Sequence, residues 1–193
     1  KTFGKIDVLI NNAGGALQIP GGPKGEFKDM PMEYWDSQMN LNLNSAAYLS
    51  RYAVEDMIAK GTEGRIVNIS SVHGQVTWVH RRMLPYSAAK AGLNMFTKAL
   101  GVEVAKYGIR VNCVAPGFIY TKLSERYTPS DLVAFSHKIP VGRGGQVEEI
   151  VPMIQFLSDI EKARFIGGQV ICVDGGQTSD GSIESMNFTI GEK

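Results

Sequence analysis

A tyrosine and a lysine stand four residues apart in the segment YSAAK, at Tyr86 and Lys90. Residues i and i+4 of a helix lie on the same face, one turn apart. A phenol has an ordinary pKa of about 10, and a cation within roughly 4–6 Å lowers it by about 1–3 units. The pair is therefore a candidate proton donor and acceptor near neutral pH. The same spacing is also typical of an ordinary amphipathic surface pair.

Two further polar positions accompany this pair. Ser70 and Ser71 directly follow a strand-like run, and ligands bind at the carboxyl ends of strands in open α/β sheets. A serine there is more often a turn or cap residue than a catalyst. Asn42 falls one turn from both Met39 and Ala46, on the helix face that should be buried. A buried amide needs hydrogen-bond partners, and a core asparagine bonded to backbone is the plainer interpretation.

These residue types suit one kind of chemistry. A serine hydroxyl can hold the carbonyl oxygen of a substrate while a tyrosine supplies or removes the proton. The carbon then still needs a hydride, which no side chain supplies. The chemistry therefore implies a nicotinamide cofactor.

The elements that must position these residues alternate between strand-like and helix-like patterns, which predicts a parallel sheet covered by helices on both faces. The strand-like runs are apolar without strict polar alternation, as suits strands buried on both faces. We expect strands at Ile6–Ile10, Arg65–Ser70, Ile109–Val114 and Gln169–Val173.

Helical patterns separate these runs. Apolar residues at steps of three and four predict a helix over Met32–Lys60. A second helix is predicted to begin with Pro85 at its first position and to end at Gly108. We also expect a cap and first turn at Thr128–Asp131 and a last helix over Gln146–Ser158.

Composition sets further limits. The 193 residues suit one domain, and the content of 44% hydrophobic and 20% charged residues is ordinary for a soluble protein. The net charge of +1 gives no sign of nucleic acid binding, and no apolar run is long enough to span a bilayer. Cys113 and Cys172 stand alone, in a spacing that fits neither a zinc site nor a disulfide framework. We therefore expect no metal, no nucleic acid, no membrane partner and a cytoplasmic location.

Six motifs stand in the order of one known family. They are NNAG at Asn11–Gly14, WDSQMNLNL around Asn42, GRIVNISS ending at Ser71, YSAAK at Tyr86–Lys90, RVNCVAPGFIYT and GGQVICVDGG. A lone Tyr-x-x-x-Lys occurs by chance in many proteins, but six ordered motifs do not. From Lys1 to about Thr178 the sequence resembles the classical short-chain dehydrogenases/reductases. The resemblance implies a Rossmann-type α/β domain, a doubly wound parallel sheet with helices on both faces, over residues 1–178, and a tail over 179–193.

The resemblance also implies catalytic roles. Tyr86 would be the general acid–base, and Lys90 would lower the Tyr86 pKa and bind the ribose hydroxyls of the nicotinamide. Ser71 would hydrogen-bond the substrate oxygen. Asn42 would hold a water that links Lys90 to solvent.

The implied cofactor is NAD or NADP. Ile119 backbone and the Thr121 hydroxyl would hold its carboxamide. Plainer interpretations are a helix cap for Thr121 and turn geometry for Gly14 and Gly117. The implied cofactor-binding residues are Asn12, Ala13, Gly14, Tyr86, Lys90, Pro116, Gly117, Ile119 and Thr121.

One part of the family pattern is absent from this sequence. Family members normally open with a strand, a glycine-rich turn of the form TGxxxGIG and two further strands, and this turn presents backbone N–H groups to the pyrophosphate. Without them, the strand Ile6–Ile10 would have an open edge. Three explanations compete: a fragment of a longer protein, which the start at Lys1 supports; a partner subunit or cleaved N-terminal piece that completes the sheet; or a miniature fold with an altered cofactor mode.

A smaller departure concerns the loop Val72–Leu84, which is longer than is usual for the family and carries His73, His80, Arg81 and Arg82. In the family this loop borders the substrate, together with the loop near Leu123–Pro140. A cationic cluster there would favour an anionic substrate, such as a keto acid or an acyl thioester. A solvated loop or a subunit contact is the plainer interpretation.

We therefore expect an oxidoreductase that transfers a hydride between a nicotinamide cofactor and a secondary alcohol or ketone. The alternative is a non-catalytic scaffold subunit without the phosphate-binding turn. Family members are usually homotetramers or homodimers. A small-residue helix face is compatible with such an assembly, formed by Ala88, Ala91, Met95 and Ala99.

Overall fold

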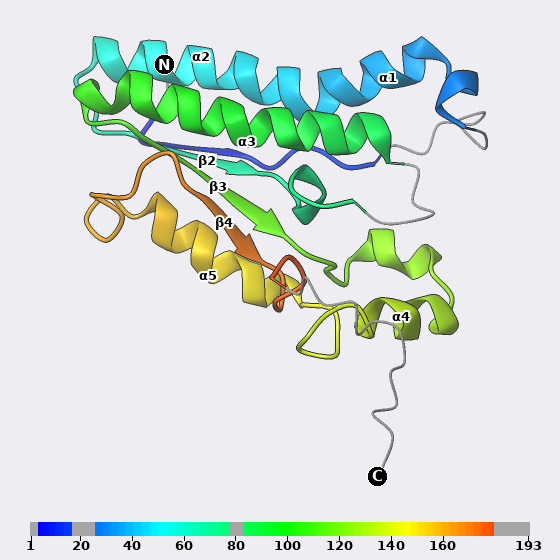
Figure 1. Ribbon diagram of the computed structural model, residues 1–193. Coiled ribbons are helices and arrows are strands. Elements are labelled where there is room, and N and C mark those ends of the chain that lie inside the picture. Colours follow the sequence, from blue (N-terminus) through cyan, green and yellow to red (C-terminus); the bar gives the residue numbers. More distant parts are fainter. Residues whose placement is uncertain (1–3, 17–25, 78–82, 180–193) are drawn as a thin grey trace.

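The computed structural model describes residues 4–16, 26–77 and 83–179, and their strands form one parallel sheet in the order β1-β2-β3-β4 (Figure 1). The registers place Leu9 beside Ile66, and Ile66 beside Val111. Each predicted strand is confirmed within two residues at either end. The strands are β1 (Val8–Asn11), β2 (Arg65–Ile69), β3 (Arg110–Pro116) and β4 (Val170–Val173).

Helices cover both faces of this sheet, as predicted. α1 (Met32–Met39), α2 (Ser45–Ala59) and α3 (Leu84–Val104) lie over one face, and α5 (Val147–Ser158) lies over the other (Figure 1). α4 (Pro129–Ser136) lies beyond the carboxyl end of β3. Among the described helices, none has both the length and the apolar character that crossing a membrane requires.

Proline, glycine and capping residues in the sequence predicted most of the helix ends. Pro85 is the second residue of α3, one position later than predicted. The helix continues through a 3-10 turn, η4 (Ala105–Tyr107), to Gly108, whose φ of 77° is the left-handed conformation common after helix ends. Thr128 caps α4, and its hydroxyl accepts a hydrogen bond from the Asp131 backbone N–H at 3.2 Å.

The predicted helix over Met32–Lys60 has an internal irregularity. α1 and α2 are joined by a π-helical turn, η2 (Asn40–Asn44), which contains Asn42. Single π turns inside α-helices are frequent at functional sites.

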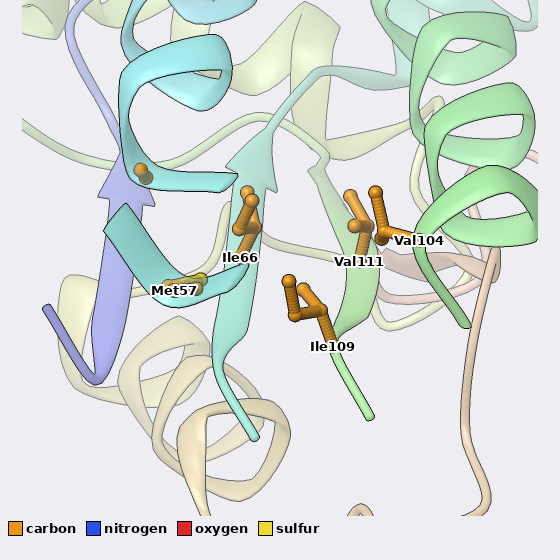
Figure 2. Close-up of a cluster of buried hydrophobic side chains, with 6 residues drawn as sticks. Met57, Ile66, Val104, Ile109 and Val111 are labelled. Carbon is orange, nitrogen blue, oxygen red and sulfur yellow. The ribbon is translucent and has the colours of Figure 1, made fainter. Parts of the chain in front are cut away.

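Two apolar clusters hold the layers together. Between α2, α3 and the sheet lie Ala53, Met57, Ile66, Val104, Ile109 and Val111 (Figure 2). Under α5 lie Val67, Val114, Ile150, Leu157 and Ala163. Ile66 and Val67 are neighbours on β2 whose side chains enter opposite clusters, as strand alternation requires. Each fully buried aliphatic side chain contributes about 1.5–3 kcal/mol, so these clusters keep the strand ends in register.

β1 lies at the edge of the described sheet and is far more exposed than β2. Ile6, Val8 and Ile10 expose 37%, 38% and 45% of their surface, whereas Ile66 on β2 is fully buried. Leu9 points the other way and packs against the cluster under α2. The expected burial on both faces is therefore wrong for β1, because only one of its faces is covered by a helix. Within the described part of the chain, the outer edge of β1 is open, as expected.

Candidate active site

A cavity of about 640 Å³ opens at the carboxyl ends of the strands, a volume within the roughly 300–1,000 Å³ typical of small-molecule sites. Its wall is built by the segments that follow β1, β2 and β3, together with parts of α3 and α5. Ala13 and Asn42 are predicted site residues that do not line it. Those that do are Asn12, Gly14, Ser71, Tyr86, Lys90, Pro116, Gly117, Ile119 and Thr121.

The structure brings Tyr86 and Ser71 together. Tyr86 lies in the first turn of α3, and Ser71 follows β2 and caps the short helix η3 (Val72–Gly74). Burial raises the pKa of Tyr86 above its ordinary value of 10.0, and a hydrogen bond with the Ser71 side chain lowers it in part. The predicted net lowering is therefore wrong, because loss of water around the phenolate outweighs the favourable contacts. Lys90 Nζ lies 5.8 Å from the centre of the Tyr86 ring.

Lys90 is buried, with 3% of its surface exposed. Its Nζ donates a hydrogen bond to the Ile69 carbonyl at 2.8 Å. Burial lowers the pKa of this ammonium from 10.5 to about 8, since a low-dielectric environment disfavours the charged form. The lysine therefore keeps its charge at neutral pH but holds the proton less strongly than a lysine in water.

The backbone at Lys90 is tied to the end of β2. Ser70 Oγ donates a hydrogen bond to the Lys90 carbonyl at 3.1 Å. A side-chain carbon at Gly74 would lie 2.8 Å from the Lys90 carbonyl carbon, so only glycine permits this approach. Sequence reasoning singled out Ser70 together with Ser71, but it assigned no positioning role to Ser70 or Gly74.

Asn42 is buried, and both polar atoms of its side-chain amide form hydrogen bonds. Its Nδ2 donates to the backbone carbonyl and the side-chain oxygen of Gln38, and to the Gly15 carbonyl, each at 3.1 Å. Its Oδ1 accepts from the Gly15 N–H at 2.8 Å. The plainer interpretation, a core asparagine bonded to backbone, is thus confirmed, and Asn42 holds the segment after β1 against the π turn. Its role in holding a water stays a prediction.

Gly14 and Gly117 are required by close approach. A side-chain carbon at Gly14 would lie 2.9 Å from Asn42 Oδ1 and 3.1 Å from Lys90 Nζ. One at Gly117 would lie 2.8 Å from the Asp174 Cα. Neither glycine has a left-handed φ, so the turn-geometry interpretation is wrong for both. Their missing side chains instead let polar groups and backbone pack beside the cavity.

Thr121 is a cap as well as a wall residue. It precedes a 3-10 helix, η5 (Lys122–Arg126). Its hydroxyl accepts a hydrogen bond from the Leu123 N–H at 3.2 Å, and the Ser124 hydroxyl accepts one from the Thr121 N–H at 2.9 Å. The helix-cap interpretation is confirmed, and the same residue lines the cavity.

Of the predicted cationic loop, His80, Arg81 and Arg82 lie outside the described residues. His73 lines the cavity, and its ring meets the Tyr86 ring edge-on with centroids 6.1 Å apart.

Sequence reasoning expected the segment near Leu123–Pro140 to border the substrate, but it did not single out two aromatic residues of the cavity wall. Phe118 and Tyr127 line the cavity, and both rings pack on Phe135 with centroid distances of 4.7 and 4.9 Å. Phe118 lies inside the motif RVNCVAPGFIYT and Tyr127 directly precedes the predicted cap at Thr128, and neither has a spacing that would single it out as a site residue.

Comparison with known proteins identifies the family. A family model described as enoyl-(acyl carrier protein) reductase matches residues 1–178. The chain is 40% identical over 174 residues to a 3-oxoacyl-[acyl-carrier-protein] reductase from Synechocystis sp., covering 90% of this chain and 66% of the relative. A solved short-chain type dehydrogenase/reductase from Mycobacterium marinum superposes with a TM-score of 0.82 at 31% identity, over 92% of this chain and 66% of that one.

The solved structure of ElxO with NADP bound superposes with a TM-score of 0.82 at 31% identity, over 92% of this chain and 69% of that one. The chain belongs to the short-chain dehydrogenase/reductase family. It spans about two thirds of the length of the relatives it matches.

Proposed function

We propose that the protein is an oxidoreductase that transfers a hydride between NAD or NADP and a secondary alcohol or ketone. The observation that carries this proposal is the meeting of Ser71, Tyr86 and Lys90 at one cavity, at the carboxyl ends of the parallel strands. Membership of the family supports the nicotinamide cofactor, and one structural neighbour has NADP bound.

The residues around the cavity fit such a cofactor. Lys90 is a buried cation beside the wall, with N–H donors suited to ribose hydroxyls. Gly14 and Gly117 belong to the wall, and their missing side chains let Asn42, Lys90 and Asp174 pack directly behind it. When bound, the nicotinamide supplies or accepts the hydride. We assign its binding to Asn12, Ala13, Gly14, Tyr86, Lys90, Pro116, Gly117, Ile119 and Thr121.

Side chains of this protein donate and accept the proton in the proposed reaction. Because burial raises the pKa of Tyr86 above its ordinary value, the phenol holds its proton and acts as the proton donor when a ketone is reduced. Ser71, hydrogen-bonded to Tyr86, presents a second hydroxyl to the same substrate oxygen. The Lys90 ammonium stabilises the negative charge that the Tyr86 oxygen acquires. Alcohol oxidation needs the phenolate first, so we expect it to become faster as the pH rises.

Asn42 is assigned a positioning role. Its amide joins the π turn to the segment after β1, and Gly14 lies between Asn42 and Lys90. We propose that a water held here passes protons between Lys90 and solvent.

We also infer a homodimer or homotetramer in the cytoplasm. Met95 and Val102 on α3 expose 64% and 80% of their surface, and Tyr48 and Tyr52 on α2 each expose 64%. Apolar faces of this kind are typical of subunit contacts. Light scattering of the full-length protein, with Met95→Glu as the disrupting variant, measures the assembly. A single monomeric mass for the unaltered protein would remove this inference.

The enzyme is tested by titrating the full-length protein with NADH and with NADPH and following nicotinamide fluorescence. We expect one of them to bind, and Tyr86→Phe to lower turnover by about a thousandfold, a far larger effect than the change in cofactor binding. Tyr107→Phe is the matched control, because Tyr107 also has a lysine, Lys106, 5.0 Å from its ring centre but stands outside the cavity wall. Absence of binding by both cofactors would instead favour the scaffold subunit.

A further inference from the structure

The charged side chains in the described wall of the cavity are all basic. Lys90 and Arg126 line it, together with His73. Among the described residues of the wall there is no aspartate or glutamate. A concave site with cationic groups and no carboxylate attracts anions, because nothing within it compensates the positive charge.

Arg126 is held in place by the side chain of Tyr127. It is the last residue of η5, and its guanidinium lies 5.0 Å from the centre of the Tyr127 ring. Its Nη2 donates a hydrogen bond to the Tyr127 hydroxyl at 3.1 Å. Tyr127 in turn packs edge-on against Phe118 and Phe135. A guanidinium anchored in this way loses less side-chain freedom when it binds a ligand than a mobile one does.

Among the described residues, no acidic side chain is paired with Arg126. No carboxylate in the described part of the chain forms an ion pair with it, whereas Arg143 donates two hydrogen bonds to the Glu149 carboxylate at 2.8 Å each. The two arginines therefore differ in availability. Arg143 is already paired, and Arg126 keeps donors for a ligand.

Lys90 and Arg126 occupy separate places in the site. Lys90 lies beside Tyr86 and the end of β2, where the proposed chemistry takes place. Arg126 belongs to a different segment, beyond β3. A substrate whose carbonyl oxygen meets Ser71 and Tyr86 would thus present a different part of itself to Arg126.

We propose that the substrate is a carbonyl compound that carries a carboxylate, and that Arg126 binds this carboxylate. The proposal rests on the oxidoreductase function proposed above. A carboxylate accepts two parallel hydrogen bonds from a guanidinium, which makes arginine the side chain best suited to recognise it. The reducing cofactor supplies the hydride, Tyr86 supplies the proton, and the carboxylate is unchanged in the reaction.

The test compares oxo acids with their methyl esters on the full-length protein. The probes are 4-oxopentanoate, 5-oxohexanoate and 6-oxoheptanoate and the methyl ester of each, which differ in the distance between carbonyl and charge. The measurements are kcat/KM, and the Kd of each probe for the cofactor complex by calorimetry. We expect one acid to be preferred over its ester by about tenfold or more, as one charge-assisted contact allows.

Variants assign this preference to Arg126. Arg126→Gln should remove the preference while changing kcat/KM for the ester by less than about threefold. Arg126→Lys should retain part of it, since it keeps the charge but not the planar fork. Tyr127→Phe, which removes the hydroxyl that accepts from Arg126, should weaken it by a few-fold. Arg51→Gln is the control, because Arg51 is exposed on α2 and outside the cavity wall.

The possible results distinguish failure of the carboxylate proposal from failure of the oxidoreductase function. Equal kcat/KM for acids and esters, no binding of any acid, or a preference that survives Arg126→Gln overturns the proposal while the oxidoreductase stands. A change in the cofactor Kd without a change in acid preference also overturns it, and places Arg126 at a cofactor phosphate. Failure to bind either cofactor removes the oxidoreductase function itself.

Discussion

Two buried cations stand at opposite ends of strand β2, and they are used differently. Arg65 is the first residue of the strand and exposes 1% of its surface; Lys90 contacts the carbonyl of the last residue, Ile69, and exposes 3%. Burial lowers the pKa of both groups. Burial alone therefore does not distinguish a structural cation from a functional one.

Their partners make the distinction. Arg65 donates to the carbonyls of Glu63, Gly64, Gly108 and Ile160, and it lies outside the cavity wall. Lys90 has one bonded acceptor among the described residues and lies in the wall. A cation enclosed by carbonyls joins loops, whereas one with donors left beside a cavity is available for chemistry.

The sharpest test of this contrast is Lys90→Met. We expect kcat to fall by about a thousandfold, because the phenolate loses its stabilising charge. We expect the free energy of unfolding to stay the same or increase, because a buried ammonium is replaced by an apolar side chain of similar length. Steady-state kinetics and urea unfolding measure the two quantities. Retained turnover would show that the lysine has no part in the chemistry.

Arg65→Met should show the reverse pattern. Four backbone carbonyls, one of them in a buried hydrogen bond, lose the Arg65 donor, so we expect the free energy of unfolding to fall by about 3 kcal/mol. The folded variant should keep kcat within about threefold, since Arg65 lies at the amino end of the sheet, away from the site. The same two measurements apply. If Arg65→Met lost most of its kcat while its stability stayed unchanged, Arg65 would be a functional cation like Lys90, and the proposed difference between them would be wrong.

The pH dependence of stability provides a smaller effect. The pKa of Lys90 is about 8 in the folded chain, against an ordinary value of 10.5. Between these values the unfolded chain binds the additional proton, so stability rises with pH in this window, by up to about 1.4 kcal/mol per pH unit. The free energies of unfolding of the unaltered protein and of Lys90→Met should therefore run parallel with pH below pH 7, and above pH 8 only that of the unaltered protein should gain the additional rise. Parallel curves throughout would mean that this lysine titrates normally.

The smallest expected effect concerns the π turn. Gln38 is fully buried, and its side-chain oxygen accepts from Asn42 Nδ2. Gln38→Leu removes this acceptor and the side-chain partner of Tyr34, and leaves the backbone carbonyls of residue 38 and Gly15, so we expect about 1 kcal/mol of destabilisation and a few-fold lower kcat. Asn44→Ala is the control, because Asn44 bonds Asn40 at the exposed side of the same turn. An equal loss in both variants would assign the effect to the turn and not to Asn42.

Much of the fold could be predicted from local patterns. The strand predicted at Arg65–Ser70 differs from β2 by one residue, and Gln146 stands as the cap of α5, where a predicted helix began. The four-residue spacing of Tyr86 and Lys90 placed both at one cavity. These features depend on neighbours along the chain, whose geometry the residue types themselves restrict.

Other features depend on which distant segments come together. The exposure of β1 follows from the absence of a helix over one of its faces in the described chain, and its apolar run resembles that of buried β2. α3 and α5 cover opposite faces of the sheet. The sequence of either helix does not predict which face it covers, because both helices carry apolar residues at the same period.

The sequence by itself determined the residue types that can move a proton, their order, and the alternation of strands and helices that brings them to one end of a sheet. Only the tertiary structure decided that Tyr86 is made less acidic by burial, that Gly14 and Gly117 are required by close approach, and that Arg126 belongs to the same cavity. The physical reason is that desolvation and steric contact arise between atoms close in space, and no periodicity along the chain records them.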